Sequence, residues 1–301
     1  MKARILILCL VLLAACQPMD MDFDDQHNRG DKAAADSVFT LTLRATKTAD
    51  TKALSLDGTK LNAYWADGEK VGVYVNGTRC GQLLVTPDTD PTKATLSGSV
   101  STAIKADDVI VLLYPDREDI TEGTKWDYTG QAGAAPAGDL AARFDYATAT
   151  LSVSSIDGAT VHTTTSSVAF QHEQSIYRLD FKENDVPKAV KWFTVSSNQN
   201  QLVTSRSYTN GNWASNHGDL TVTLTGNGAT SPYVSLRNEN TNQADTYSFL
   251  VVGGDDALYA GVKDIPADKL GNGKFLAPGV TLTKTNLHNP TGLISNPNDV
   301  L

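Results

Sequence analysis

Alternation of apolar and polar residues is the dominant pattern of this chain from about residue 38 onward. Residues 39–43 (FTLTL), 70–75 (KVGVYV) and 220–224 (LTVTL) repeat with a period of two, which predicts strands with one buried and one exposed face. Asn76-Gly77, directly after the second stretch, is a hairpin turn signal. Residues 109–114 (VIVLLY) form a continuous apolar run that fits a strand in a sandwich core.

The second half of the chain repeats this style. Residues 177–181, 247–252 and 280–284 are further strand candidates, and no long segment keeps a helical period. Short strands separated by Gly, Asn and Asp turns are typical of antiparallel β-sandwiches. The sequence therefore predicts an all-β protein in which helix is minor.

The length of 301 residues predicts two domains. The polar stretch 157–167 (DGATVHTTTSS) is the candidate boundary, which gives an N-terminal domain at residues 37–165 and a C-terminal domain at residues 166–301. The same stretch fits equally well a polar strand at an exposed sheet edge. Both interpretations stay open at this point.

The N-terminus follows a different pattern. Lys2 and Arg4 precede an apolar run at residues 5–13 and two alanines, which is the order of a secretory signal peptide over residues 1–15. The run is shorter than the roughly 20 apolar residues that cross a bilayer. Residues 13–16 (LAAC) resemble the lipobox of bacterial lipoproteins, whose cysteine is acylated, so a lipid anchor is expected on Cys16. An ordinary signal with a chance cysteine is the alternative.

Residues 16–36 are expected to form an acidic tether, because their composition cannot bury a core. The aspartates that follow Cys16 resemble the acidic export signal of surface lipoproteins. We therefore expect a protein that is held in the outer membrane by its lipid and is exposed on the cell surface.

Charge and motif content argue against several functional classes. The formal net charge of −9 disfavours nucleic acid as a partner. The chain carries no G-x-S-x-G, H-E-x-x-H, P-loop or G-x-G-x-x-G motif, and its histidines and carboxylate pairs lack ligand or catalytic spacing. No catalytic residue, metal site or cofactor is expected, and a binding or structural protein is favoured over an enzyme.

Aromatic residues offer a different chemistry. Trp126, Trp192 and Trp213 are candidates for sugar-stacking platforms, which would make the chain a non-polymerising, glycan-binding surface lipoprotein. An aromatic residue on a strand is more often part of the core. Solvent exposure of these three side chains separates the two interpretations.

Two stretches resemble a known family. Residues 51–53 (TKA) followed by 63–74 (AYWADGEKVGVY) resemble the "T-R-A … W-x-x-G-D-x-I-G-V-Y" pattern near the start of fimbrillins, the pilins and pilin-like lipoproteins of gut and oral Bacteroidota. Residues 168–181 (VAFQHEQSIYRLDF) are similar to the mid-chain "F-x-H-x-x-A-x-L-x-F" segment of that family. Glu69, Lys52 and Ser175 depart from the two patterns.

The resemblance implies a fold and a function. Fimbrillins have two tandem transthyretin-like β-sandwich domains and reach the outer membrane as lipoproteins. A trypsin-like protease removes their first strand, and a strand from another fimbrial subunit fills the groove by β-augmentation. The resemblance thus implies an adhesive fimbrial subunit or accessory, with other subunits and a host or bacterial surface ligand as partners.

This sequence offers residues for each part of that assembly. The removable strand would be Phe39–Arg44, and the expected cut is the Arg44–Ala45 bond, with Lys47 and Lys52 as secondary options. A permanent strand is the alternative, as in family members that act as anchors and keep lipid and first strand. The apolar face of the removable strand would be Phe39, Leu41 and Leu43, and the donor residues would be Val280 and Leu282 or, in the tail at 291–301, Leu293 and Ile294.

Overall fold

The computed structural model describes residues 38–47, 55–57, 60–62, 64–116, 124–133, 140, 143–209 and 212–285. All of them lie within one compact unit, Ser37–Leu301. Cys16, Lys52, Leu293 and Ile294 fall outside the described residues, so the predictions made for them stay predictions. No helix in the described part of the chain is long and apolar enough to cross a membrane.

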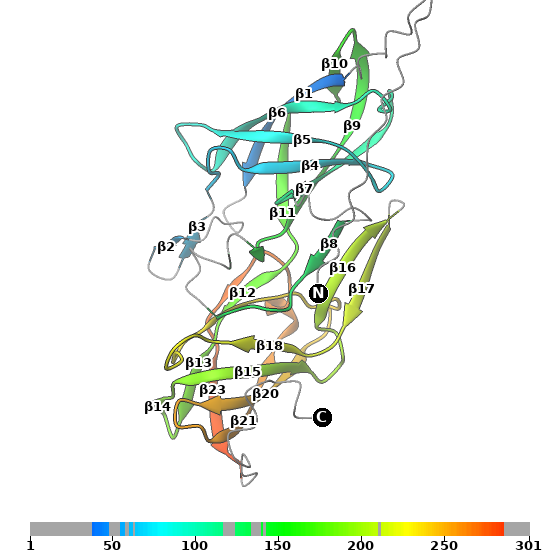
Figure 1. The fold of residues 1–301 in the computed structure, drawn as a ribbon. Coiled ribbons are helices and arrows are strands. Elements are labelled where there is room, and N and C mark those ends of the chain that lie inside the picture. The colour runs from blue at the N-terminus through cyan, green and yellow to red at the C-terminus, as the bar shows by residue number, and fades with distance from the viewer. Residues whose placement is uncertain are drawn as a thin grey trace, which may run out of the picture. The chain divides into compact units, whose positions relative to one another are not determined.

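The first sheet contains eight strands in the order β10-β1-β11-β9-β7-β4-β5-β6, and a further pairing between β1 and β6 closes the sheet on itself (Figure 1). The β4–β5 connection is the predicted hairpin, with positive φ at Asn76 and Gly77, as a type I′ turn requires. The strands are β1 (Val38–Lys47), β4 (Lys70–Val75), β5 (Thr78–Pro87), β6 (Lys93–Ser101), β7 (Val109–Tyr114), β9 (Ala147–Asp157), β10 (Thr160–Thr163) and β11 (Ser167–His172).

A second, seven-stranded sheet follows in the order β14-β13-β23-β21-β20-β15-β18. Smaller sheets have the orders β19-β12-β22, β17-β16-β8 and β2-β3. The strands of these sheets are β2 (Ser55–Asp57), β3 (Lys60–Asn62), β8 (Thr124–Asp127), β12 (Ser175–Arg178), β13 (Asp180–Glu183), β14 (Val186–Pro187), β15 (Val190–Ser197), β16 (Val203–Thr209), β17 (Asn212–His217), β18 (Leu220–Thr223), β19 (Tyr233–Leu236), β20 (Asp245–Gly253), β21 (Leu258–Ile265), β22 (Phe275–Leu276) and β23 (Gly279–Lys284), and a 3-10 helix, η2, spans Ala267–Lys269.

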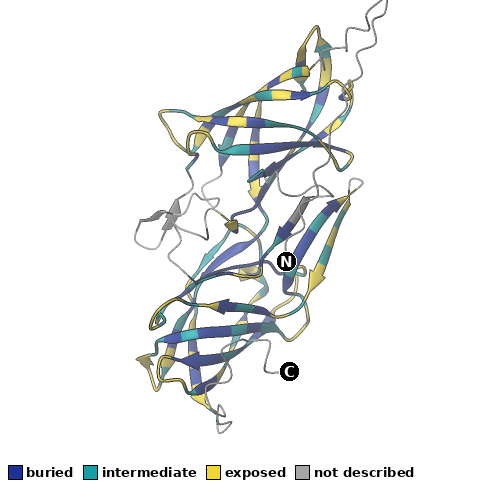
Figure 2. Ribbon diagram, viewed as in Figure 1, coloured by how far each residue is buried: buried dark blue, intermediate teal, exposed yellow. Residues whose placement is uncertain are grey.

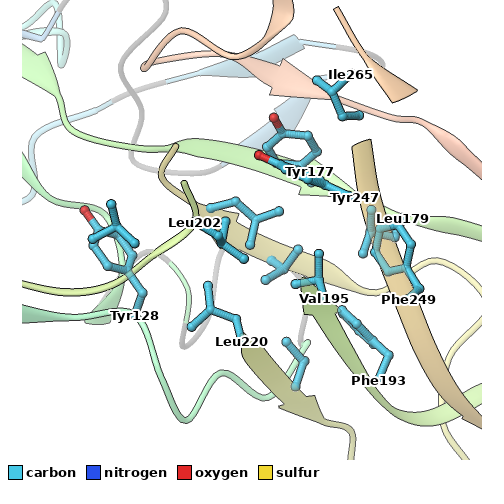
Figure 3. Packing of buried hydrophobic residues seen from close by; sticks show 14 of the residues in the cluster. Tyr128, Tyr177, Leu179, Phe193, Val195, Leu202, Leu220, Tyr247, Phe249 and Ile265 are labelled. Carbon is cyan, nitrogen blue, oxygen red and sulfur yellow. The ribbon is translucent and has the colours of Figure 1, made fainter. Parts of the chain in front are cut away.

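Two large clusters of buried residues form the core. One lies inside the first sheet and includes Leu41, Leu43 and Val73. The other is built mainly from residues after 176 and is rich in aromatic rings, among them Tyr177 and Tyr247, whose side chains lie side by side (Figure 3). Buried and exposed positions alternate along many of the strands (Figure 2), as the period-two pattern predicted.

The prediction of an all-β fold is confirmed for the described residues, while the transthyretin-like tandem arrangement stays a proposal. Thr160–Thr163 within the polar stretch forms β10, which pairs with β9 and β1. This agrees with the alternative of a polar strand. Ser167–His172, which follows the expected boundary at 165/166, forms β11 and pairs with β1 of the first sheet. The domain boundary itself stays a prediction.

Candidate functional site

The first described strand, β1, is the strand that closes the first sheet. It runs antiparallel to β6 over Val38–Thr46 on one edge. On its other edge it runs parallel to β10 and then to β11. The amides of Thr40 and Arg44 donate to the carbonyls of Ala159 and Ser166 at 2.7 and 2.8 Å. Both edges of β1 are therefore hydrogen-bonded, and its removal would leave two strand edges unpaired (Figure 1).

The inward face of β1 carries an apolar side chain at every second position. Leu41, Leu43 and Ala45 are 0%, 1% and 1% exposed, whereas Thr40 and Thr42 face solvent. Phe39 is half-buried against the same cluster. Full burial of each leucine contributes about 1.5–3 kcal/mol. The predicted apolar residues thus fix the strand in the core of the first sheet.

Lys47, the last residue of β1, continues the inward face and is 2% exposed. Its Nζ lies 4.1 Å from the ring centroid of Trp65 and 4.1 Å from that of Tyr114. It also donates to the backbone carbonyl of Tyr64 at 3.1 Å and lies 3.6 Å from Oε2 of Glu69. We call this surround the lysine cage: the side chains of Trp65, Tyr114 and Glu69 with the carbonyl of Tyr64.

The first motif shared with fimbrillins builds this cage. Trp65 and Glu69 belong to its W-x-x-G-E segment, where Gly68 has a φ of +77° and the Ala66 amide donates to Glu69 Oε2 at 3.0 Å. Tyr114 donates its hydroxyl to Glu69 Oε1 at 2.6 Å. The turn therefore aims a carboxylate at the end of β1.

Aromatic packing holds the cage wall in place. The Trp65 ring contacts Tyr114 and Phe170 edge to face, with both centroid distances at 5.3 Å. Phe170 belongs to the second motif, in β11. Edge-to-face pairs of this kind contribute about 0.5–1.5 kcal/mol each beyond the area that they bury, so the two motifs meet in one wall.

Burial and charge act against each other in the cage. Burial lowers the pKa of the Lys47 amine, and the negative charges of Glu69 and Asp145 partly offset this. Burial also raises the pKa of the Tyr114 hydroxyl well above its usual value, and Glu69 adds to that effect. Tyr114 therefore stays protonated and keeps its hydrogen bond to Glu69.

Arg44, the expected cleavage residue, lies inside β1 rather than at its end. Its side chain faces solvent, forms an ion pair with Asp88 and donates to Thr95 Oγ1 at 3.0 Å. The Arg44 and Ala45 positions pair with β6 and β11 at once. The strand continues to Lys47, so its predicted end at Arg44 was three residues short. Arg44 and Lys47 both lie in β1 and are paired with neighbouring strands in the folded chain.

The first two donor candidates, Val280 and Leu282, belong to a strand that is already paired within the second sheet. Val280 and Leu282 are 0% and 3% exposed and lie in β23, which is paired with β13 on one side and β21 on the other. As β23 stands, these two residues are core residues of their own chain.

The tryptophans do not form the exposed platform that glycan stacking requires. Trp126 is 0% exposed and lies between the rings of Tyr146 and Trp213, at centroid distances of 5.0 and 4.4 Å. Trp192 is 5% exposed and packs in a small apolar cluster. Trp213 is half-buried, with the Arg206 guanidinium over its ring at 4.4 Å. The core interpretation holds for Trp126 and Trp192.

A buried polar network that the sequence did not indicate lies at the end of β11. Asp145 Oδ1 is 2.6 Å from His172 Nδ1, and Glu173 accepts hydrogen bonds from Arg206 and Arg237 at 2.8 and 2.6 Å. Buried charges of this kind need partners to be tolerated. Because these residues are far apart in sequence, only the second motif, which contains His172 and Glu173, pointed toward them.

Comparison with known proteins gives weak similarities only. No family model and no curated protein matches the chain. Among solved structures, it is similar to one described as a "putative cell adhesion protein" from Bacteroides uniformis, with 14% identity, coverage of 83% of this chain and 98% of that one, and a TM-score of 0.47.

Two further similar structures come from related bacteria. A fimbrial assembly protein from Parabacteroides distasonis shares 11% identity over 80% of this chain and 90% of its own, with a TM-score of 0.41. The tip fimbrial protein Mfa3 from Porphyromonas gingivalis shares 10% identity over 76% and 81%, with a TM-score of 0.37. These names agree with the resemblance to fimbrillins in the sequence. At such TM-scores they carry no argument about function.

Proposed function

We propose that this protein is a surface-exposed subunit or accessory of an adhesive fimbria, in which a protease removes β1 and a strand of another subunit replaces it. The observation that carries the proposal is the position of β1, the first described strand, which closes the first sheet through a ladder on each edge. An open groove with two unpaired edges is a template for a strand of another chain. The two fimbrillin-like motifs support the same function.

The lipid anchor belongs to the same proposal. Acylated Cys16 would carry the chain to the outer membrane, and the acidic residues 16–36 would hold the folded part away from it. A cut beyond the tether would then release the chain from its anchor. Cell-surface exposure is thus a stage before assembly.

The geometry of β1 shifts the proposed cut away from Arg44. A cut after Arg44 would leave Ala45–Lys47 attached to the folded chain and paired with β6 and β11, so the groove would open only in part. Lys52 is the first basic residue after β1. We therefore propose cleavage after Lys52, which frees the whole strand.

The same reasoning favours the tail as donor strand. Val280 and Leu282 fill the core of their own chain, so donating them would break one sheet to complete another. Residues 291–301, with Leu293 and Ile294, are the candidate that leaves β23 in place.

Limited proteolysis tests the proposal. The mature chain with Cys16→Ser, which removes the acylation site, is digested briefly with trypsin, and its N-terminus is sequenced. We expect a new terminus at Ala53 and, after it, SDS-resistant ladders and fibres. Lys52→Gln should block both, and the matched variant Arg44→Gln should block neither. A terminus at Ala45 would overturn the position of the cut. A cut chain that stays monomeric would overturn polymerisation and support a permanent anchor.

A further inference from the structure

We propose that the lysine cage is a specificity pocket of the β1 groove, and that the groove accepts a strand of a different subunit that carries a lysine at the position of Lys47. The inference rests on the proposed strand exchange and names the chemistry of the strand that is exchanged.

The groove imposes a side-chain pattern on any strand that fills it. Leu41, Leu43 and Ala45 occupy consecutive inward positions, and Ala45 sits between Ala94 of β6 and Val168 of β11 in the register. The next inward position is the cage. A strand that fits the groove therefore has four inward residues, each two positions after the last: an apolar residue, a second apolar residue, a small residue and a lysine.

The cage discriminates by charge as well as by size. An apolar side chain of the same length would fill the space between the Trp65 and Tyr114 rings. It would leave the carbonyl of Tyr64 without the donor that it now has, and Glu69 without a nearby cation. An amine in a buried aromatic surround gains a cation–π attraction that corresponds to tenfold or more in binding. Lysine is thus favoured over methionine or alanine.

This chain's own tail does not match the pattern. Residues 291–301 (TGLISNPNDVL) contain no lysine. Val280, Leu282 and Lys284 have the spacing, but Leu282 would fall at the position of Ala45, and β23 is held in its own sheet. A second copy that donated its tail would leave the cage empty, so the structure points to a lysine-bearing strand of another subunit. The groove then takes the tail of a second copy more weakly than a lysine-bearing strand of another subunit.

Peptide exchange into the full chain tests the inference. Residues 49–54 are replaced by the recognition sequence of a site-specific protease, so that β1 is cut free but stays in place. Labelled peptides are then added in excess: residues 38–47 (VFTLTLRATK), the same peptide with Lys47→Met, and residues 291–301. Uptake into the cut chain is measured as retained label after gel filtration.

The lysine cage predicts uptake of the VFTLTLRATK peptide with at least about tenfold preference over its Lys47→Met version and over the tail peptide. Equal uptake of the lysine and methionine peptides would overturn the cage while leaving strand exchange intact. Preferred uptake of the tail peptide would also overturn it. Failure of every peptide to enter, with β1 retained, would overturn strand exchange and the inference with it.

A chain variant controls for peptide solubility. Glu69→Gln keeps a hydrogen-bond acceptor for Tyr114 but removes the charge near Lys47. The preference for the lysine peptide over the methionine peptide should shrink severalfold in this variant. An unchanged preference would show that Glu69 and its charge take no part, which would contradict the cage as described.

Discussion

The first and last described strands, β1 and β23, occupy equivalent places in two different sheets. Each pairs antiparallel with one neighbour, β6 or β21, and parallel with the other, β11 or β13. Their anchoring differs. β1 has three buried apolar residues and a caged lysine, whereas β23 has Val280 and Leu282 only. Each end of the described chain thus completes a sheet, and of these two strands β1 is the one with a buried charged residue, Lys47.

Two lysines extend the comparison. Lys47 in the first sheet is buried between rings, and its pKa is lowered mainly by that burial. Lys188 near the second sheet lies 4.4 Å from the ring centroid of Tyr259 and contacts Glu183 and Asp255 at 2.9 Å each. Burial lowers its pKa too, but hydrogen bonds with Tyr259, Glu183 and Asp255 outweigh this, so the net pKa is raised. Both lysines lie beside an aromatic ring and a carboxylate, yet the pKa is lowered for Lys47 and raised for Lys188, because Lys47 is more deeply buried.

The largest expected effect comes from the apolar anchors of the two strands. Leu41→Ala and Leu282→Ala should each lower the free energy of unfolding by about 2–5 kcal/mol, since each leaves a cavity in a packed core. Urea unfolding measures the change. Hydrogen exchange should locate it, in β6 and β11 for Leu41→Ala and in β13 and β21 for Leu282→Ala. Faster exchange in the opposite sheet would contradict the assigned pairings.

Truncation of the caged lysine should rank next. Lys47→Ala is expected to lower the free energy of unfolding by about 2–3 kcal/mol, because it removes a desolvated cation–π contact and leaves Glu69 without its cation. Lys188→Met is the variant for comparison near the second sheet. A change under about 0.5 kcal/mol for Lys47→Ala, measured in the same urea titration, would show that the cage does not hold β1.

The half-buried lysine of that comparison, Lys188, should matter less. Lys188→Met is expected to cost about 1 kcal/mol or less, because partly solvated ion pairs contribute little to stability. Differential scanning calorimetry at low and high salt measures it, and the small effect should shrink further with salt. A loss equal to that of Lys47→Ala would remove the distinction between the two lysines.

The smallest effects should be pH-dependent and opposite in sign. With its pKa lowered from 10.5 in the folded chain, the cost of burying charged Lys47 is fully present at lower pH and is relieved as pH rises toward 10.5. The stability of wild type relative to Lys47→Met should therefore rise in that window. For Lys188, whose pKa is raised from 10.5, the contribution is present below 10.5 and is lost as pH rises above it.

Urea unfolding of wild type, Lys47→Met and Lys188→Met from pH 8 to pH 11.5 measures both differences. The stability of wild type relative to Lys47→Met should increase as pH rises toward 10.5. The stability of wild type relative to Lys188→Met should decrease as pH rises above 10.5. Parallel curves for the two variants would contradict the assigned environments.

Local patterns in the sequence predicted much of the fold and less of the site. Period two placed β1 and its buried leucines, and Asn76-Gly77 predicted the β4–β5 turn, because both depend on neighbouring residues. The ring closure by β1 depends on pairing with β6 and β11, which are far along the chain. The alternation of positions 41, 43 and 45 would have placed Lys47 on the inward face. Its charge marked it as a protease site instead, since a lysine is rarely buried without partners.

The surroundings of the donor and glycan candidates could not be predicted from the sequence for a similar reason. Val280 and Leu282 show the same alternation as any strand. The neighbouring residues in the sequence do not determine whether a strand pairs within its own chain or with another. Trp126 and Trp192 are large aromatic residues on strands, and only the packing of distant rings decides that they are buried.

The N-terminal residue of the chain recovered from assembled fimbriae on the cell surface tests the central claim most directly. Removal of the whole strand β1 predicts a terminus at Ala53, without lipid. A chain that begins at acylated Cys16 in the assembled fraction would show that β1 is kept, and would contradict the exchange of this strand.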